Sequence, residues 1–175
     1  TRTKDSYEKI LSAFSNGEAD VLIGTQMIVK GHDFPKVTLV GILAADLSLN
    51  ASDYRAGERT FQLLTQAVGR AGRGALPGEA VIQTYQPDHY AITCAAAQDY
   101  KSFYEEEILY RELSGYPPAA HMLAVQIYGK EEENVKQLAR RLTDVVKSNM
   151  DFLQILGPTP ANISKINDIY RYVFY

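Results

Sequence analysis

The first half of the chain alternates continuously apolar runs with helical patterns, and this alternation constrains the fold more than any other feature. The runs ADVLIGT (residues 19–25), KVTLVGILAAD (36–46) and EAVIQTY (79–85) are typical of strands buried on both faces. A long helical pattern over residues 52–71 separates the second run from the third. Strands that alternate with helices predict an α/β fold with a parallel sheet and right-handed crossovers.

The second half has a different pattern, in which helices come first and strands follow. The predicted elements are helices over residues 88–98 and 99–114, a strand over 121–129, a helix over 131–148 and an interior strand over 171–175. This order predicts a small α+β domain. We place the boundary near Pro117, after the glycine stop and two prolines of SGYPP, which gives domains 1–116 and 117–175. The predicted apolar stripe of helix 131–148 is Val135, Leu138, Leu142 and Val145.

Composition excludes several classes of protein. With 46% hydrophobic and 22% charged residues, the chain is typical of a globular protein, and no apolar run approaches the roughly 20 residues that span a bilayer. A single cysteine, Cys94, excludes a disulfide framework and a cysteine zinc site within this chain, so we expect a cytoplasmic protein. The formal net charge of −3 argues against a strongly basic nucleic-acid module. Because the chain begins without methionine and ends in a strand-like run, we expect it to be a segment of a larger protein.

The stretch QAVGRAGRG (residues 66–74) places three glycines and two arginines directly after the long helical pattern. Each glycine weakens a helix by about 1 kcal/mol relative to alanine, and a local rule broken in this way often marks a functional site. At 100° per residue, one side of the helix is apolar and packs on the sheet, and the other carries the polar residues. The apolar side is Phe61, Leu64, Val68 and Ala71, and the opposite side is Gln66, Gly69, Arg70 and Arg73. Arginine suits phosphate recognition, but a surface helix that ends at a glycine, with solvated arginines, explains the same pattern.

Loops at the carboxyl ends of parallel strands bind ligands, so we expect binding residues after Thr25, after Asp46 and around Arg73. After Thr25 the chain continues QMIVKGHDF. Thr25 and Lys30 have the chemistry to contact nucleic-acid phosphates, and Asp33 to bind a ribose hydroxyl or a water. The alternatives are a turn cap for Thr25, a solvated Lys30 and an ordinary loop position for His32.

Together these motifs resemble a known family. GTQMIVKGHDFP followed by QAVGRAGR resembles motifs V and VI of superfamily 2 helicases. The intervening AADLSLNASDYRAGERTFQLL narrows the resemblance to the primosomal replication-restart helicases, the PriA family. RELSGYPP and LGPTPANISKINDIYRY are similar to the C-terminal region of that family, so the resemblance covers nearly the whole chain.

The resemblance implies the later part of a RecA-like helicase lobe two, followed by the start of a small α+β C-terminal domain. In this family two lobes clamp one ATP, and the first supplies the phosphate-binding loop and the magnesium ligands. No G-x-x-x-x-G-K-[ST] is present, so ATP and magnesium would be shared with a lobe outside this chain. The family's zinc cysteines are expected upstream, and this chain is expected to hold no metal.

The implied catalytic residues are Arg73 as arginine finger, Arg70 beside it and Gln66. The implied ATP-binding residues are Gly31, Asp33, Gly69, Arg70 and Arg73, and the implied DNA-binding residues are Thr25, Gln26 and Lys30.

The function implied by the resemblance is that of an ATP-dependent 3′–5′ DNA helicase that restarts stalled replication forks, of which this segment alone would be inactive. The implied partners are branched or single-stranded DNA, single-strand-binding protein and primosome proteins, with a monomeric protein at the bacterial nucleoid and no membrane. Two alternatives stay open. Another superfamily 2 translocase is opposed by SGYPP and LGPTPA, and a non-catalytic DNA- or partner-binding module is opposed by the complete spacing of Gln66, Arg70 and Arg73.

Overall fold

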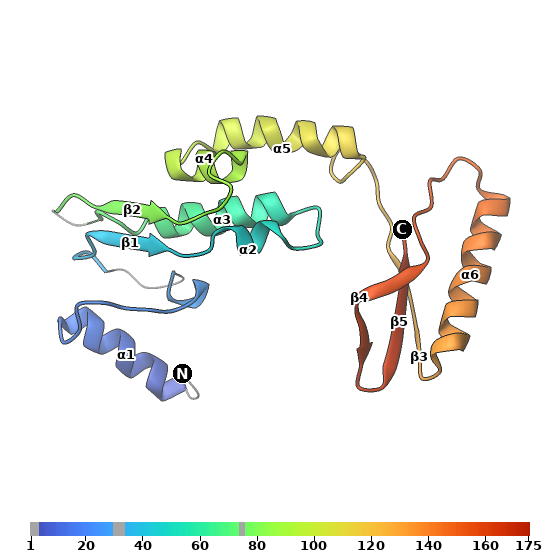
Figure 1. Cartoon of the computed structure of the whole chain (residues 1–175), viewed down its shortest axis with the longest axis horizontal. Helices are drawn as coiled ribbons and strands as arrows, with labels where there is room; N and C mark the ends of the chain where they lie inside the picture. Colours follow the sequence, from blue (N-terminus) through green and yellow to red (C-terminus); the bar gives the residue numbers. More distant parts are fainter. Residues whose placement is uncertain (1–3, 30–33, 74–75) are drawn as a thin grey trace. The chain divides into compact units, whose positions relative to one another are not determined.

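The structure, a computed structural model, describes residues 4–29, 34–73 and 76–175 (Figure 1). Packing divides the chain into two compact units, residues 1–107 and 108–175. The division falls inside helix α5 (Tyr100–Ser114), before the boundary that the sequence predicts between residues 116 and 117. The predicted domains 1–116 and 117–175 stay a prediction. Among the described residues, no helix is both long and apolar enough to cross a membrane.

The first unit contains a short parallel sheet covered by helices. Strands β1 and β2 pair in parallel from Leu39 opposite Glu79 to Ile42 opposite Ile82, which confirms the predicted α/β class and parallel pairing. Phe61 and Leu64 of α3 form the buried core with apolar residues of α4 and α5. The elements are α1 (Lys4–Asn16), η1 (Gln26–Val29), β1 (Leu39–Ile42), α2 (Asp46–Leu49), α3 (Ala56–Val68), β2 (Glu79–Ile82), α4 (Tyr90–Ala97) and the first part of α5.

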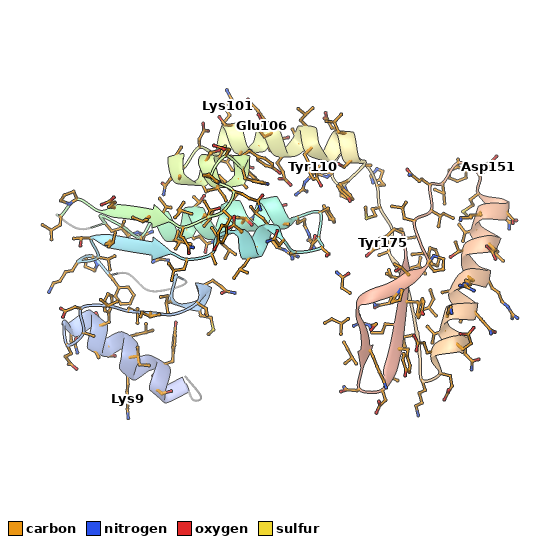
Figure 2. All side chains as sticks on the ribbon, viewed as in Figure 1. Lys9, Lys101, Glu106, Tyr110, Asp151 and Tyr175 are labelled. Atoms are coloured by element: carbon orange, nitrogen blue, oxygen red, sulfur yellow. The ribbon has the colours of Figure 1, made fainter. Side chains whose placement is uncertain are left out.

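Aromatic stacking holds α5 against α3. The ring of Phe103 stacks on that of Phe61 with centroids 4.0 Å apart, and Tyr100 lies at 6.2 Å from the same ring. On the other side of α5, Lys101 points away from α4 into solvent (Figure 2). The helix therefore has one aromatic face in the core and one charged face outside.

One predicted strand of the first unit is absent. Residues 19–25 have no assigned strand, and Val21 and Ile23 are 73% and 89% exposed, so the prediction of a buried strand there is wrong for this chain. An apolar run forms a strand only where neighbouring strands pair with it. The sheet of the described residues in this unit consists of β1 and β2, and neither pairs with residues 19–25.

The second unit is a three-stranded antiparallel sheet with one helix. β3 (Val125–Gly129), α6 (Glu132–Asn149), β4 (Thr159–Ile166) and β5 (Ile169–Phe174) follow in chain order, and the strands lie in the order β3-β5-β4. The central strand β5 contains most of RYVFY, which confirms the predicted interior strand. The predicted strand over 121–129 and helix over 131–148 are also confirmed, within a few residues at their ends.

Strand β4 and its hairpin were not predicted. Ile166 pairs with Ile169, and the two residues between them, Asn167 and Asp168, have φ of +48° and +59°. Two positive φ values in a two-residue loop are typical of a type I′ turn, in which asparagine and aspartate are favoured. The dipeptide Asn-Asp was therefore the signal that could have located this hairpin.

Helix α6 buries a different face from the one predicted. Val135, Ala139 and Thr143 are buried against the sheet, whereas Leu138, Leu142 and Val145 are between 37% and 59% exposed. The predicted stripe is thus correct at Val135 and wrong at the three other positions. The buried residues recur every four positions, and two of them are small, which lets the helix approach Ile127 and Tyr172 closely. The hydroxyl of Thr143 donates to the carbonyl of Ala139 at 2.8 Å, so its polar group is satisfied inside the helix.

Candidate functional site

The C-terminal end of α3 presents the predicted arginines. Phe61 and Leu64 are buried as predicted, Gln66 and Arg73 are exposed, and Arg70 is half-buried. The helix therefore carries a buried apolar side and an accessible polar side, as the sequence predicts. Gln66 and Arg73 are therefore both accessible from solvent on this side.

Of the two glycines that weaken this helix, Gly72 has a clear structural cause. Its φ is +70°, and a Cβ there would lie 2.7 Å from the backbone nitrogen of Gly78. Its N–H donates to the carbonyl of Val37 at 3.2 Å, which fixes the turn beside β1. Gly69 differs, because its φ is −66° and the nearest atoms to a Cβ there would be the carbonyl oxygen of Thr65 at 3.2 Å and the side-chain nitrogen of Gln98 at 3.4 Å. The close approach of another backbone thus explains Gly72 and leaves Gly69 unexplained.

Arg73 is held against the end of α3. Its Nε donates to the carbonyl of Gly69 at 2.7 Å, one of the carbonyl groups that the helix itself leaves unsatisfied. A cation at this position also interacts favourably with the negative end of the helix dipole. The arginine is therefore oriented by its own helix, with the guanidinium at the protein surface.

The loop around Arg73 lies at the amino ends of the strands, not at the carboxyl ends as predicted. Gly72 bonds to Val37, which precedes β1, and Glu79 at the start of β2 bonds to Thr38. α3 runs back along the sheet between two parallel strands, so its C-terminus returns to the edge where both strands begin. The three candidate loops thus do not share one edge of the sheet.

Asp46 occupies the carboxyl edge, and the sequence did not single out its side chain. The buried carboxylate accepts hydrogen bonds from the hydroxyl of Thr84 at 2.5 Å and from the N–H of Tyr85 at 3.0 Å, so it joins the residues that follow β1 and β2. The Thr84 hydroxyl, followed by the Tyr85 N–H, holds the pKa of this carboxyl below its usual range. Next to it, Ala44 has φ of +52° and donates its N–H to the side-chain oxygen of Gln83 at 3.1 Å. Hydrogen bonds of polar side chains thus connect the segments that follow β1 and β2 at this edge of the sheet.

A polar cluster links α4 and α5. The Nδ1 atom of His89 accepts the N–H of Ala91 at 3.1 Å and caps α4, and burial lowers the pKa of this imidazole. The hydroxyl of Tyr90 donates to Oε2 of Glu107 at 2.8 Å. A Cβ at Gly57 would lie within 3 Å of both partners, so the glycine lets α3 pack against this pair. We assign the cluster to packing of the helices.

The predicted DNA-binding segment lies next to α3. Thr25 and Gln26 are exposed at the start of η1, and the carbonyl of Thr25 accepts the N–H of Ile28 at 3.1 Å. η1 contacts α3, the helix that carries Gln66 and ends two residues before Arg70. The predicted residues Lys30, Gly31, His32 and Asp33 lie outside the described residues.

The described residues offer donors for phosphate but no metal site. No group of three or more histidine, cysteine, aspartate or glutamate side chains gathers to hold a metal ion in the part of the chain that the structure describes. An open groove of about 410 Å³ is lined mainly by apolar side chains of α3, β2 and α4, and none of the predicted site residues lines it. The guanidinium groups of Arg70 and Arg73 have the chemistry to bind phosphate oxygens, whereas guanidinium groups are not ligands of magnesium ions.

Two family models match the chain. Residues 1–75 match the helicase conserved C-terminal domain, and residues 112–175 match the primosomal protein N C-terminal domain. The first match contains the predicted motifs V and VI, and the second contains the whole sheet of the second unit.

Curated relatives match over almost the whole chain and carry the name replication restart protein PriA. The Bacillus subtilis protein is 46% identical over 173 residues, 98% of this chain and 22% of that protein. The Chlamydia muridarum protein is 42% identical over 99% of this chain and 23% of its own length, and the Rickettsia felis protein is 42% identical over 98% and 26%. The chain thus spans about a quarter of the length of these relatives. The resemblance predicted from the sequence is confirmed, and the chain belongs to the PriA family of replication restart proteins.

Proposed function

We propose that this chain is part of an ATP-dependent 3′–5′ DNA helicase that restarts stalled replication forks. Its relatives are named replication restart proteins, and residues 1–75 match a helicase domain. In this proposal the end of α3 supplies Arg70 and Arg73 to an ATP and magnesium held mainly by another part of the full-length protein. The segment alone has no complete ATP site and is inactive.

The observation that carries the proposal is the fixed position of Arg73. The contact between Gly72 and Gly78 constrains the turn that follows α3, and the bond from Arg73 to Gly69 holds the arginine beside the end of the helix. Arginine fingers raise the rate of nucleotide hydrolysis by roughly 10³–10⁵ because they stabilise charge that develops in the transition state. A preoriented, exposed guanidinium is suited to that role, and Gln66 on the same side of the helix is suited to orient the attacking water.

The contact between η1 and α3 supports a coupling between DNA and nucleotide. Thr25, Gln26 and Lys30 bind the DNA backbone in this proposal, and Gly31 and Asp33 contribute to ATP binding. Branched or single-stranded DNA, single-strand-binding protein and primosome proteins are the proposed partners of the full-length protein, which acts as a monomer at the bacterial nucleoid. The zinc of the family belongs to a part of the protein that precedes these motifs.

Substitution of Arg73 in the full-length protein tests the proposal. Arg73→Ala should lower DNA-stimulated ATP turnover by about 10³-fold or more and change DNA affinity only a few-fold. Arg73→Lys keeps a cation that can cap α3 but loses the planar guanidinium, which can donate two parallel hydrogen bonds to a phosphate. This variant should therefore also be inactive, and its melting temperature should equal that of the parent. Turnover of Arg73→Ala within a few-fold of the parent would reduce Arg73 to a helix cap and favour a non-catalytic module.

Lys30→Ala provides the contrasting variant. If Lys30 binds a DNA phosphate, its loss should weaken binding to all sequences about equally and lower the salt slope by about one. Hydrolysis should then recover in saturating DNA, which Arg73→Ala should not do. Arg141→Ala, at an exposed arginine of α6, serves as the control for loss of a surface charge.

A further inference from the structure

A second pair of arginines lies at the other end of α3. Arg55 is the residue before the helix and Arg59 is in its first turn, and their side chains are 49% and 50% exposed. The thirteen residues of α3 span about 20 Å, so this pair is well separated from Arg70 and Arg73.

One carboxylate orients both arginines. Oδ1 of Asp53 accepts the backbone N–H of Arg55 at 3.0 Å and lies 3.6 Å from its Nε. Oδ2 of the same carboxylate lies 2.9 Å from a terminal nitrogen of Arg59. Two long side chains that would otherwise sample many rotamers are thereby held in a defined arrangement, with half of each side chain still open to solvent.

An aromatic ring adjoins the pair. The guanidinium carbon of Arg55 lies 5.4 Å from the centroid of the Tyr54 ring, within the range of a cation–π interaction. Arginines beside an aromatic ring form the combination with which proteins bind single-stranded nucleic acids, because the cations contact phosphates and the ring stacks on a base.

The position of the arginines is unfavourable for the helix itself. The N-cap of α3 prefers a side chain that accepts a hydrogen bond, and Arg55 makes no such bond. Cations at this end also meet the positive end of the helix dipole. The acidic residue of the first turn, Glu58, accepts a hydrogen bond from Gln62 at 3.1 Å. Residue types that are unfavourable for the helix N-terminus, as these arginines are, are expected at functional sites.

The cluster lies on the ligand-binding side of the sheet. β1 is followed directly by Asp46 and α2, and α2 contacts α3. Figure 1 shows α2 and the loop before α3 on the side toward which the arrows of β1 and β2 point. Ligands of α/β sheets bind beyond these carboxyl ends.

We propose that Arg55 and Arg59, oriented by Asp53, bind the sugar–phosphate backbone of single-stranded DNA, and that Tyr54 stacks on a base. This inference rests on the proposed helicase function and adds a DNA contact to it. α3 then carries a DNA-binding pair at its N-terminus and a nucleotide-binding pair at its C-terminus, so that one rigid helix touches both ligands.

The test is DNA binding by the full-length protein, measured by fluorescence anisotropy of an oligo-dT strand over a range of salt concentrations. Arg55→Ala and Arg59→Ala should each weaken binding roughly tenfold, because each removes hydrogen bonds to a charged group. The double variant should lower the salt slope by about 1.4, since each phosphate contact to a single strand contributes about 0.7. ATP turnover of the double variant should recover in saturating DNA, and Arg141→Ala should leave affinity and slope unchanged. The double variant Arg55→Lys/Arg59→Lys, which preserves both charges, should keep the slope and lose part of the affinity.

Two further measurements separate this site from its alternatives. Asp53→Asn removes a negative charge, so it should tighten binding if only net charge matters and weaken it if orientation of the arginines matters; tighter binding would contradict the orienting role. ATP affinity of the double variant should equal that of the parent, and a loss of ATP affinity with unchanged DNA affinity would instead assign these arginines to a free nucleotide. Parental affinity and salt slope in a folded double variant would overturn the proposal while leaving the helicase function intact. Failure of the parent itself to hydrolyse ATP in the presence of DNA would instead contradict the helicase function.

Discussion

The backbone of Gly72 packs directly against that of Gly78, so that a Cβ on Gly72 would lie 2.7 Å from the Gly78 nitrogen and 3.1 Å from its Cα. This contact brings the turn after α3 to the residue that precedes β2. The same turn is tied to Val37 before β1 by a 3.2 Å hydrogen bond. Arg73 follows directly, so its position depends on a contact that only two glycines permit.

Gly72→Ala should therefore destabilise the protein more than Gly69→Ala. A residue with φ of +70° costs about 1–3 kcal/mol when it is not glycine, and the clash with Gly78 adds to this cost. Gly69→Ala should be neutral or should stabilise the protein by up to about 1 kcal/mol, because its φ of −66° suits alanine. Urea unfolding followed by circular dichroism measures both variants. Equal losses would show that the contact with Gly78 does not determine stability.

The hairpin between β4 and β5 gives a second prediction. Asn167→Val places a β-branched residue at φ of +48°, which should reduce the free energy of unfolding by about 1–2 kcal/mol. Asp168→Gly yields the Asn-Gly pair preferred in type I′ turns and should be neutral or stabilising, apart from loss of the 3.0 Å ion pair to Lys165. Thermal melting of both variants is the measurement, and a higher melting temperature for Asn167→Val would contradict the turn assignment.

The elements that the sequence predicts correctly are those whose partners are near in the chain or whose pattern is strong. β1, β2 and α3 have continuous apolar runs or a clear helical period, and Gly115 ends α5 with φ of +67° as the glycine stop predicts. Residues 19–25 have an equally apolar run but form no strand, because pairing depends on neighbours that a local pattern does not reveal. β4 was missed for the opposite reason, since half of the residues of its sequence TPANISKI are polar and its pairing with β5 is interrupted by a bulge.

In the candidate site, too, a local sequence pattern does not reveal contacts between residues that are distant in the chain. Periodicity places Gln66 and Arg73 on the exposed side of α3, as the structure has them. It does not reveal that Asp46 binds Thr84, because the two residues are 38 positions apart and follow different strands, Asp46 at the start of α2 after β1 and Thr84 after β2. It also does not reveal that the loop around Arg73 lies at the amino ends of the strands, because that depends on the direction in which α3 crosses the sheet.

The two faces of α6 can be distinguished by paired substitutions. Ala139 is completely buried, so Ala139→Leu should overpack the contact with the sheet and reduce stability by about 1–3 kcal/mol. Leu138→Ser, at a position 48% exposed, should cost no more than about 0.5 kcal/mol. Chemical denaturation of the two variants measures the difference. If Leu138→Ser were the more damaging change, the stripe expected from the sequence would describe the buried face after all.

Asp46 gives a prediction about pH. The folded-state pKa of this carboxyl lies below the ordinary value of 3.8, chiefly because of the Thr84 hydroxyl and then the Tyr85 N–H. A carboxyl whose pKa is lowered by folding stabilises the protein fully above its unfolded pKa, and this stabilisation is lost as the pH falls through the folded pKa. Asp46→Asn should therefore melt at a lower temperature than the parent at neutral pH, and the difference should shrink as the pH falls below 3.8.

Because Asp53 and Asp99 also have lowered pKa values, the measurement is the difference between the two melting temperatures at each pH, and not the acid unfolding of the parent alone. Thr84→Val removes the first donor and should reproduce part of the neutral-pH loss. A difference in melting temperature that stays constant down to about pH 2 would show that the ionised carboxylate is not what joins the ends of β1 and β2.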